Sequence, residues 1–393
     1  MKILSIETSC DETAVSLIEA TGDFPSAEYK VLGNALFSQI DIHREYGGVF
    51  PAVAKREHAK TLVPMLQKAL KEAEELKSNQ VKTFTVPDTL EVMLDREPEL
   101  FEQLSVFVKE NDKPDIDQIA VTAGPGLEPT LWVGVNFAKA LALIWNVPVV
   151  PVNHMEGHVL SSVFDGTNLA ELQFPALALL ISGGHTELIK MNEWSRYEKI
   201  GATRDDAVGE AFDKVARLLG LQYPGGPEIS RRASEARASN LPMFAKLPRP
   251  MLDSNDLDFS FSGLKTAVRY AVQDKELSED EVKAISRDFE DAVTEVLLKK
   301  TERAVSEYNI QSLILGGGVS ANKHLRDSFT DFFKREYPEL SLYLPDPKLS
   351  TDNSIMIALA GHARSQDAVT PADEAFSLIR ASGNRSLSDE GVS

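Results

Sequence analysis

Two local patterns each occur twice in the chain of 393 residues, and this repetition constrains its fold more than any other feature. A strand, a short polar turn and a second strand are predicted at KILSIETSCDETAVSLIEA (residues 2–20) and again at PALALLISGGHTELIKM (residues 175–191). A strand, a glycine-containing loop and a helix are predicted at residues 118–143 and again at residues 312–336. The repetition predicts an α/β protein with two duplicated lobes that face a central cleft.

The positions of these patterns define the expected domains. The first lobe is expected to span residues 1–149, and the second to span residues 150–351. A C-terminal helix at about residues 352–365 is expected to join the first lobe, whereas the small and polar residues 366–393 are expected to form a flexible tail. Further helices are expected at residues 57–76, 207–220, 261–273 and 277–306.

An insertion is expected to interrupt the first lobe at about residues 77–114, where polar residues and three prolines surround one amphipathic segment, PELFEQLSVFVKEN. Its apolar positions are Leu100, Phe101, Leu104 and Phe107. These side chains would pack either on their own lobe or on another subunit, and we favour their own lobe.

The overall charge restricts how the chain can bind nucleic acid. With 60 acidic and 41 basic residues the net charge is −19, so any such contact must be local. Residues 214–250 depart from this trend, with seven Lys and Arg residues against two Glu residues. This segment is either an ordinary solvated surface or a contact for nucleic-acid phosphates.

Neither a membrane segment nor a secretory signal is predicted. No apolar run reaches the roughly 18–20 residues needed to span a bilayer, and Glu7 and Asp11 interrupt the apolar run at the N-terminus. The single cysteine, Cys10, suits a reducing compartment. We therefore expect a cytoplasmic protein without a membrane partner.

The segment VNHMEGHVL places His154 and His158 four residues apart, which on a helix puts both imidazoles on one face. This spacing favours a metal site, with a pair of ordinary surface or hydrogen-bonded histidines as the alternative. Asp352 in STDNS is the candidate for a third ligand, because the residues beside it can orient a carboxylate. A zinc-protease motif is a weaker interpretation, since Glu156 does not directly follow the first histidine.

Glycine-rich loops indicate places where a ligand can approach the backbone. GGGVSA at residues 316–321 has the form of a dinucleotide fingerprint, although an isolated match is weak evidence for NAD. GPGLEPT (residues 124–130) and PGGP (residues 224–227) are either further ligand loops or simple turns. ISGGHT (residues 181–186) offers free N–H groups and a hydroxyl at a hairpin tip, where phosphate oxygens can bind.

The corresponding tip in the first lobe, SETSCDET, combines hydroxyl groups with two acids. Its hydroxyls can donate to anions, and Asp11 and Glu12 can accept a proton or orient a metal ion. Asp11 is the candidate general base, with a capping role in the turn as the alternative. Cys10 has no histidine beside it in the sequence, so we interpret it as a packed side chain rather than a nucleophile.

Taken together, the motifs of this chain resemble those of the bacterial tRNA adenosine threonylcarbamoyltransferase family (TsaD), which belongs to the actin/Hsp70/sugar-kinase (ASKHA) fold superfamily. The resemblance extends from Lys2 to about His362. It is carried by the segments IETSCDETAVS, GPGL, VGVNFAKALA, NHMEGH, SGGHT, DDAVGEAFDKVARLLGL, YPGGP, FSFSGLKTAV, GGGVSANKHLR and TDNSIMIA. It implies an actin/Hsp70-like fold for each lobe. The chain departs from the family pattern in GLEPTLWVG and in the insertion.

The resemblance also implies the cofactor and the ligand site. His154, His158 and Asp352 would hold one divalent metal ion per subunit, iron or zinc. Asp213 and the glycine of PGGP would face the ribose and adenine of threonylcarbamoyl-adenylate, and Asn322 would close the adenine side. The residues implied to line this site are Leu180, Ile181, Ser182, Gly183, Gly184, Asp213, Gly226 and Asn322.

The implied reaction transfers the threonylcarbamoyl group from the adenylate to N6 of the adenosine 3′ of the anticodon, in tRNAs that read codons beginning with A, and releases AMP. The implied partners are TsaB and TsaE, with TsaC supplying the adenylate. Two other classes remain open: a sugar-kinase or chaperone-like ATPase of the same superfamily, and a non-catalytic scaffold, which would be expected to lack the metal residues.

Overall fold

The structure, a computed structural model, describes residues 1–78 and 87–389. In this part of the chain the residues form two compact units, each with its own hydrophobic core. Unit 1 comprises Met1–Asp41, Val49–Ala170 and Asp352–Leu387. Unit 2 comprises Ile42–Gly48, Glu171–Thr351 and the described residues from Ser388.

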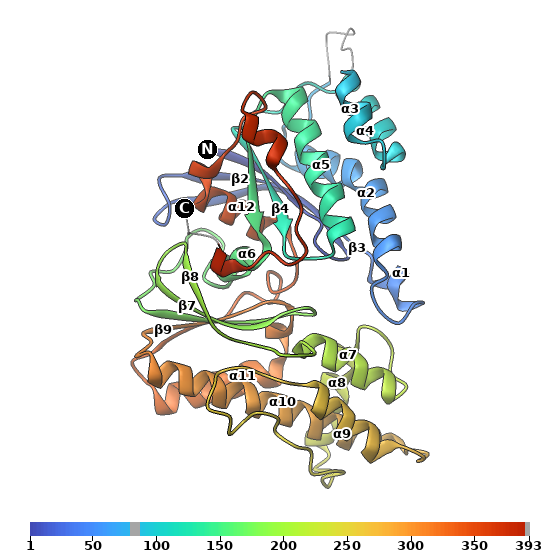
Figure 1. Ribbon diagram of the computed structural model, residues 1–393, viewed down its shortest axis with the longest axis vertical. Helices are drawn as coiled ribbons and strands as arrows, with labels where there is room; N and C mark the ends of the chain where they lie inside the picture. Colours follow the sequence, from blue (N-terminus) through green and yellow to red (C-terminus); the bar gives the residue numbers. More distant parts are fainter. Residues whose placement is uncertain (79–86, 390–393) are drawn as a thin grey trace. The chain divides into compact units, whose positions relative to one another are not determined.

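Unit 1 is built on a mixed sheet with the strand order β3-β2-β1-β4-β5 (Figure 1). The first three strands form an antiparallel meander, β4 pairs in parallel with β1, and β5 pairs in parallel with β4. The strands are β1 (Lys2–Glu7), β2 (Glu12–Thr21), β3 (Glu28–Ser38), β4 (Gln118–Gly124) and β5 (Val149–Asn153). The sheet therefore starts with the predicted hairpin and continues through the predicted strand, loop and helix.

Unit 2 repeats this topology strand for strand, in the order β8-β7-β6-β9-β10. Again three strands form an antiparallel meander, and the last two run parallel to the first. They are β6 (Ala176–Ile181), β7 (Thr186–Glu193), β8 (Arg196–Ala202), β9 (Ser312–Gly316) and β10 (Ser341–Tyr343). The predicted duplication of the α/β lobe is thus confirmed.

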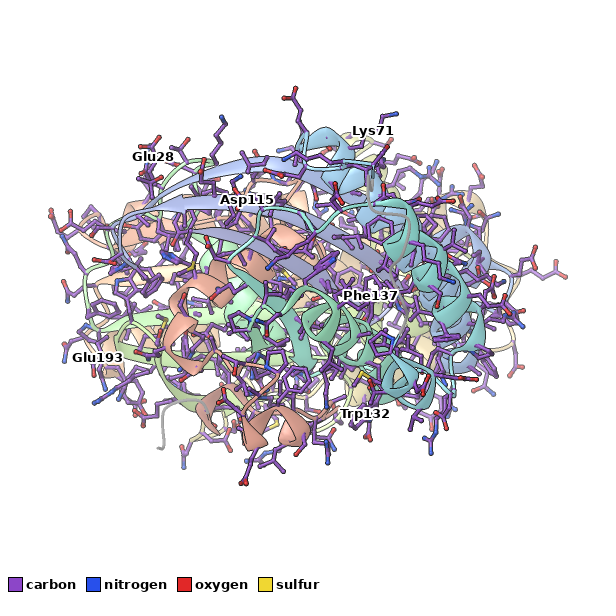
Figure 2. All side chains as sticks on the ribbon, turned by 90° about the horizontal axis from the view of Figure 1, so that it is seen from above. Glu28, Lys71, Asp115, Trp132, Phe137 and Glu193 are labelled. Atoms are coloured by element: carbon purple, nitrogen blue, oxygen red, sulfur yellow. The ribbon has the colours of Figure 1, made fainter. Side chains whose placement is uncertain are left out.

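Helices cover both faces of the sheet in unit 1, because side chains alternate between its faces. Leu4 and Ile6 of β1 join the apolar core that includes α2 and α5, whereas Ser5 donates a hydrogen bond to the carbonyl of Ser354 in α12. Figure 2 shows Phe137 of α5 inside the unit, while Lys71 reaches the outside. The helices are α2 (Pro51–Glu72), α3 (Asp88–Met93), α4 (Pro98–Glu110), α5 (Glu128–Trp145), α6 (His154–Ser162) and α12 (Ser354–Ala363). The short helix α1 (Ile40–Arg44) contains residues assigned to both units.

The insertion packs on its own unit, as favoured from the sequence. Leu100, Leu104 and Phe107 of α4 are buried in the core of unit 1, and Phe101 packs against the same core. Proline at the first turn of α4 is compatible with a helix start, because that position needs no intrahelical N–H donor. Part of the predicted insertion, residues 79–86, lies outside the described residues.

Unit 2 carries its helices around a core centred on Phe289 and the apolar face of its sheet. The predicted helices at 207–220, 261–273 and 277–306 are confirmed with small shifts of their ends. A helix at the basic segment, α8, was not predicted, because its few apolar residues give a weak periodic signal. The helices are α7 (Val208–Leu218), α8 (Gly225–Ala238), α9 (Ser262–Val272), α10 (Glu279–Glu307) and α11 (Lys323–Glu336), with the short helix η1 (Gly318–Ala321).

Within the described residues, the C-terminal region differs from the flexible tail that we predicted for residues 366–393. Val369 forms a bridge with Val149 of β5, and Phe376, Ile379 and Ala381 join the core of unit 1. Three short turns of 3-10 helix lie in this region: η2 (Ser365–Asp367), η3 (Glu374–Leu378) and η4 (Leu387–Asp389). The prediction was wrong here because a few dispersed apolar residues are enough to anchor an otherwise polar segment.

The boundary between the units also lies later than the predicted one at residues 149 and 150. The helix α6 packs on α12, so the segment up to Ala170 belongs to unit 1. The histidine pair that we assigned to the second lobe therefore lies in unit 1. The sequence did not predict this boundary because α6 packs on a helix about 200 residues later, and no local pattern indicates such a contact.

Candidate metal centre and ligand-binding turns

The helix α6 brings the two predicted histidines together. It begins directly after β5, where the side chain of Asn153 caps it by accepting a hydrogen bond of 2.9 Å from the backbone N–H of Met155. His154 and His158 lie one turn apart and are buried, with ring centroids separated by 4.6 Å. The predicted helical placement of the pair on one face is confirmed.

Asp352 completes the cluster from the start of α12. Its Oδ1 atom lies 3.4 Å from Nε2 of His154 and 3.2 Å from Nε2 of His158. One ligand atom from each of the three residues falls within 4.8 Å of the other two. The next residue, Asn353, caps α12 through its side chain, which fixes where the helix begins.

The donor set fits a divalent cation. Neither ring nitrogen of His158 makes a hydrogen bond within the described part of the chain, although both are buried. A buried polar atom without a hydrogen bond is costly, and a metal ion would satisfy one of these nitrogens. Two imidazoles and one carboxylate with open positions suit catalytic zinc or non-haem iron.

The charges around the cluster agree with this arrangement. Burial works against a charge on His154, yet Asp352 and Glu7 outweigh it and raise the pKa of His154. Burial lowers the pKa of His158, which keeps this imidazole neutral and able to coordinate. Burial opposes ionisation of Asp352, but the neighbouring His154 and His158 hold its pKa well below the usual range.

Glu7 was missed as a site residue by the sequence analysis. Its side chain is fully buried at the end of β1, and Oε2 lies 3.1 Å from Nδ1 of His154. The backbone N–H of Ser9 donates to Oε1 at 2.5 Å, and the hydroxyl of Thr122 donates to Oε2 at 2.6 Å. An acid that ends the apolar run ILSIE was the available signal, since a buried carboxylate needs partners.

Glu156 does not have the role that a zinc-protease motif would give it. Its carboxylate is buried and accepts hydrogen bonds of 3.0 and 3.1 Å from Nε of Arg364, at the end of α12. This ion pair connects α6 to the end of α12, and Asp352 lies just before the start of the same helix. Glu156 therefore helps to hold the two helices that carry the cluster together. Because its carboxylate is paired with Arg364, it does not serve as the general base that a zinc protease requires.

Asp11 and Glu12 lie at the first hairpin tip, in unit 1 with the metal cluster. Asp11 is buried, and its carbonyl accepts a hydrogen bond from the N–H of Gln39. Burial raises the pKa of Glu12, and the negative charges of Asp11 and Asp352 raise it further. Burial and the same two charges raise the pKa of Cys10, so its thiol stays protonated, in agreement with a packed side chain.

The first tip is packed, and its two hydroxyl residues Thr8 and Ser9 differ in their hydrogen bonds. Thr8 donates to the carbonyl of Thr130 at 3.0 Å, and the carbonyl of Ser9 accepts hydrogen bonds from Leu127 and Thr130. Thr8 and Ser9 are buried. The tip is thus packed against the GPGL loop and the start of α5, so the hydroxyl of Thr8 is not available to an anion. The buried Oγ of Ser9 makes no hydrogen bond within the described residues, and anion binding by this hydroxyl stays a prediction.

The second tip, in unit 2, has the open form that was predicted. Ser182 closes the turn by exchanging hydrogen bonds with His185, and Gly183 and Gly184 are exposed. A Cβ atom at either glycine would meet no heavy atom within 4 Å. The carbonyl of Ser182 accepts the N–H of Gly209 in the first turn of α7, which holds that helix start beside the tip.

Most of the other predicted ligand residues of unit 2 lie around this tip. Leu180 pairs with Gly316 where β6 and β9 end, and a Cβ atom at Gly317 would lie only 2.5 Å from the carbonyl oxygen of Ile181. Oδ1 of Asp213 accepts a hydrogen bond of 2.7 Å from the N–H of Gly225, next to Gly226 in the PGGP turn. Carboxyl ends of parallel strands are where ligands bind in α/β sheets.

Asn322 has a structural role that the sequence did not predict. Its Oδ1 atom caps α11 by accepting the N–H of Leu325 at 2.9 Å, and its Nδ2 atom donates to Glu290 at 2.7 Å. Glu290 in turn pairs with Arg237 of α8. The side chain therefore links α8, α10 and α11, and these bonds fix its position at the end of the GGGVSA loop.

The basic segment at residues 214–250 is largely paired with acids of its own unit. Arg231 pairs with Glu228 and Glu235, both on α8. The other ion pairs are Lys214 with Asp206 and Glu210, Arg232 with Glu279, Arg237 with Glu290 and Asp291, and Arg249 with Glu295. These acids lower the positive field of the segment, which favours an ordinary solvated surface.

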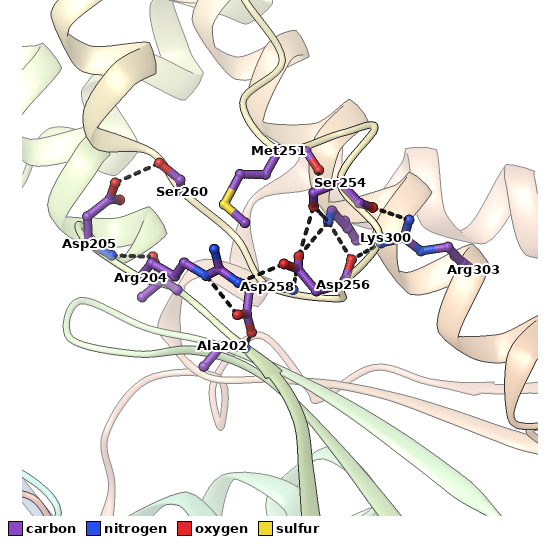
Figure 3. Close-up of polar contacts among 11 residues, drawn as sticks. Ala202, Arg204, Asp205, Met251, Ser254, Asp256, Asp258, Ser260, Lys300 and Arg303 are labelled. Atoms are coloured by element: carbon purple, nitrogen blue, oxygen red, sulfur yellow. Dashed lines mark hydrogen bonds and ion pairs between the residues drawn. The ribbon is translucent and has the colours of Figure 1, made fainter.

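Another ion-pair network in unit 2 holds the loop that leads into α9 (Figure 3). Arg204 donates to Asp256 and Asp258, and the buried amine of Lys300 donates to the hydroxyl of Ser254 and the carbonyl of Asp256. Each charged group in this network has a partner. The network therefore stabilises the loop and offers no open ligand position.

None of the described helices combines the length and the apolar character needed to cross a membrane.

Sequence comparison finds a match to the family model described as TsaD, tRNA N6-adenosine threonylcarbamoyltransferase, over residues 30–86 and 106–359. The unmatched residues 87–105 fall within the predicted insertion. A tRNA N6-adenosine threonylcarbamoyltransferase of Persephonella marina is 41% identical over 379 residues, which cover 96% of this chain and 94% of that protein.

Solved structures with a similar fold include two HypF proteins. Full-length HypF in a phosphate- and nucleotide-bound form is 13% identical with a TM-score of 0.51, and covers 93% of this chain and 46% of that one. HypF of T. kodakarensis is 12% identical with a TM-score of 0.51, and covers 93% and 48%. This chain spans less than half the length of either structure. At these identities the likeness supports the fold alone, an actin/Hsp70-like arrangement of α/β units.

Proposed function

The chain belongs to the family of tRNA N6-adenosine threonylcarbamoyltransferases, and from this premise we propose the reaction that it catalyses and the residues that carry it. It is a transferase that modifies adenosine in tRNA. The donor is threonylcarbamoyl-adenylate, and the acceptor is N6 of the adenosine 3′ of the anticodon in tRNAs that read codons beginning with A. The candidate metal ligands and the candidate proton acceptor belong to unit 1, and the turns assigned to the donor belong to unit 2.

The observation that carries this proposal is the cluster of the buried His154 and His158 with the partly buried Asp352, whose ligand atoms lie within 4.8 Å of one another. These residues would hold one divalent ion, iron or zinc. When bound, the ion supplies positive charge for phosphate or carbonyl oxygens of the donor. Glu7 holds His154 at Nδ1, which leaves Nε2 directed at the ligand position.

Donor binding is assigned to the turns of unit 2. The exposed glycines of the second tip allow close approach of a phosphate or carbonyl group, and the starts of α7 and α8 present N–H groups that favour anions. Asp213 and Gly226 face the ribose and adenine, and Asn322 closes the adenine side. The complete set is Leu180, Ile181, Ser182, Gly183, Gly184, Asp213, Gly226 and Asn322.

Transfer needs no covalent intermediate, because the donor is an activated anhydride. N6 attacks the carbamoyl carbon, the bond from that carbon to the phosphate oxygen breaks, and AMP leaves with the bonding electrons. Asp11 accepts the proton that N6 loses. Exocyclic adenine nitrogen is a poor nucleophile, so a general base and fixed geometry both contribute to the rate.

The partners follow from the family. TsaB and TsaE assist the transferase, and TsaC makes the adenylate that it consumes. A cytoplasmic location is part of the proposal and agrees with a tRNA substrate. Apolar side chains of α3 and α4 pack into the core of unit 1. Any contact of the insertion with these partner proteins would therefore use its outer surface.

The test is mass spectrometry of tRNA nucleosides after incubation of the chain with threonine, bicarbonate, ATP, tRNA and the three partners. We expect threonylcarbamoyladenosine to form at the predicted adenosine, and AMP to appear in proportion. When tRNA is omitted, this chain should no longer release AMP from the donor. Steady ATP turnover without tRNA and without modified nucleoside would instead indicate a kinase or chaperone-like ATPase.

A further inference from the structure

Glu7 lies between the metal cluster and the first hairpin tip, and its contacts extend in both directions. Toward the cluster, Oε2 is 3.1 Å from Nδ1 of His154. A carboxylate at this nitrogen fixes the tautomer and the ring orientation of a metal-binding histidine. The hydroxyl of Thr122 donates to the same oxygen at 2.6 Å, so the carboxylate itself has a fixed rotamer.

Toward the tip, Glu7 is held by the backbone. The N–H of Ser9 donates to Oε1, and the carbonyl of Ser9 accepts the N–H of Leu127 at 2.7 Å. A Cβ atom at Gly126 would lie 2.6 Å from the same carbonyl oxygen, so the GPGL loop is in close contact with the tip. The position of Glu7 therefore depends on that of the loop.

The loop is held in turn by the C-terminal segment, which we define as residues 369–387. The N–H of Gly126 donates to the carbonyl of Gly383, and the N–H of Ser382 donates to the carbonyl of Ala123 at 2.8 Å. Phe376 anchors the segment in the core, where the amine of Lys139 lies 5.3 Å from its ring centroid. All of these contacts lie within unit 1.

We propose that Glu7 is a positioning residue for the metal ligand His154, and that the C-terminal segment maintains this position through the GPGL loop and Ser9. The proposal rests on the proposed metal site. It assigns a role to a region outside the matched family residues, which end at residue 359. Loss of the segment would loosen the tip first, and the histidine orientation as a consequence.

Cobalt(II) is the probe, because its visible spectrum reports on coordination independently of transfer activity. We expect Glu7→Gln to weaken cobalt binding about 10- to 100-fold, as for other groups that orient metal ligands, and to change the spectrum of the bound ion. Thr122→Val keeps the volume of the side chain and should produce a smaller loss. Thermal melting of both variants checks that unit 1 is folded.

The C-terminal segment is tested by Phe376→Ala, with Leu378→Ala as the matched control on the same turn, because Leu378 is exposed. Phe376→Ala should speed hydrogen exchange at the amides of Ser9 and Leu127 and weaken cobalt binding several-fold, whereas the control should do neither. The inference would be overturned, with the proposed metal site intact, if the native chain bound cobalt tightly and the folded Glu7→Gln variant bound it with the same affinity and the same spectrum. Absence of cobalt binding by the native chain would overturn the proposed metal site and the inference with it.

Discussion

The two hairpin tips occupy equivalent places in the duplicated sheets but have opposite environments. In unit 1 the tip at residues 8–11 is largely buried, and its polar groups bond to the GPGL loop and α5. In unit 2 the tip at residues 182–185 is exposed at Gly183 and Gly184. The same topology therefore gives a packed tip in one unit and an open turn in the other.

Neighbouring glycines explain much of this difference. Gly134 of α5 allows the hydroxyl of Thr8 to come within 2.2 Å of the place where a Cβ atom would lie, so helix and tip are in direct contact. In unit 2 the chain after β9 first forms η1, and α11 begins only at Lys323. Gly134 thus allows α5 to pack directly on the tip of unit 1, whereas Gly183 and Gly184 leave the tip of unit 2 open.

The largest effect is expected when the metal ligands of unit 1 are removed. His154→Ala combined with His158→Ala should abolish metal binding and slow transfer by at least about 10³-fold, because a bound ion contributes several kcal/mol to charge stabilisation. Elemental analysis and single-turnover transfer measure the two effects. His324→Ala, in unit 2, is the control. Stoichiometric metal in the double variant would contradict the assignment of unit 1.

Asp11→Asn tests whether the packed tip takes part in chemistry. The variant keeps the shape of the side chain and removes its charge, so we expect near-native stability with transfer slowed at least about 10²-fold, as for loss of a general base. The measurement is single-turnover transfer to tRNA with the donor bound in advance. A native rate under conditions where chemistry is limiting would leave Asp11 with a purely structural role.

One pair of glycine substitutions compares the tips directly. Gly126→Ala introduces a Cβ atom 2.6 Å from the carbonyl oxygen of Ser9 at a φ of 155°, and should destabilise the protein by about 1–3 kcal/mol. Gly184→Ala meets open space, so stability should change by less than about 0.5 kcal/mol.

Gly184→Ala should instead weaken donor binding about 10-fold, the scale of one misplaced methyl group in a pocket. Thermal melting and calorimetric titration with a non-hydrolysable donor analogue separate the two outcomes. Equal losses of stability in both variants would remove the distinction between a packed and an open tip.

A pH-dependent effect is expected for a helix start in unit 2. Burial opposes ionisation of Asp205, but hydrogen bonds from Ser260, Ser262 and the N–H of Phe261 lower its pKa. Figure 3 shows the hydrogen bond from Ser260. Its stabilisation is therefore present above the unfolded pKa of about 4 and is lost as the pH falls through the folded value.

Asp205→Ala should cost about 1 kcal/mol at pH 7, comparable with the loss of a helix cap, and the cost should fall as the solution is acidified below about pH 4. Urea titrations at several pH values give the difference between native chain and variant. A cost that stays constant through this range would show that the carboxylate charge is not involved.

The smallest effect is expected from the basic segment. Arg231 is half exposed and pairs with Glu228 and Glu235, so Arg231→Ala should change stability by less than about 0.5 kcal/mol. The salt dependence of tRNA binding should also remain unchanged. A slope reduced by about one would instead identify a phosphate contact at Arg231.

Regular alternation and helical spacing made the fold predictable from the sequence. The apolar runs around SETSCDET and ISGGHT correctly predict both hairpins, and the spacing of His154 and His158 correctly predicts one helical face. Glu7 was missed because its role comes from His154, 147 residues later. The acid that ends the run ILSIE is a signal for a candidate residue, but the sequence does not show which distant group this carboxylate contacts.

The sequence by itself thus determined the duplicated α/β topology and the candidate metal ligands, because both depend on short-range periodicity that side chains impose on strands and helices. The tertiary structure alone decided that the first tip is packed, that residues 369–387 fold onto unit 1, and that Asn322 links three helices. These features depend on which distant groups meet once the cores form, and burial then requires each polar group to find a partner.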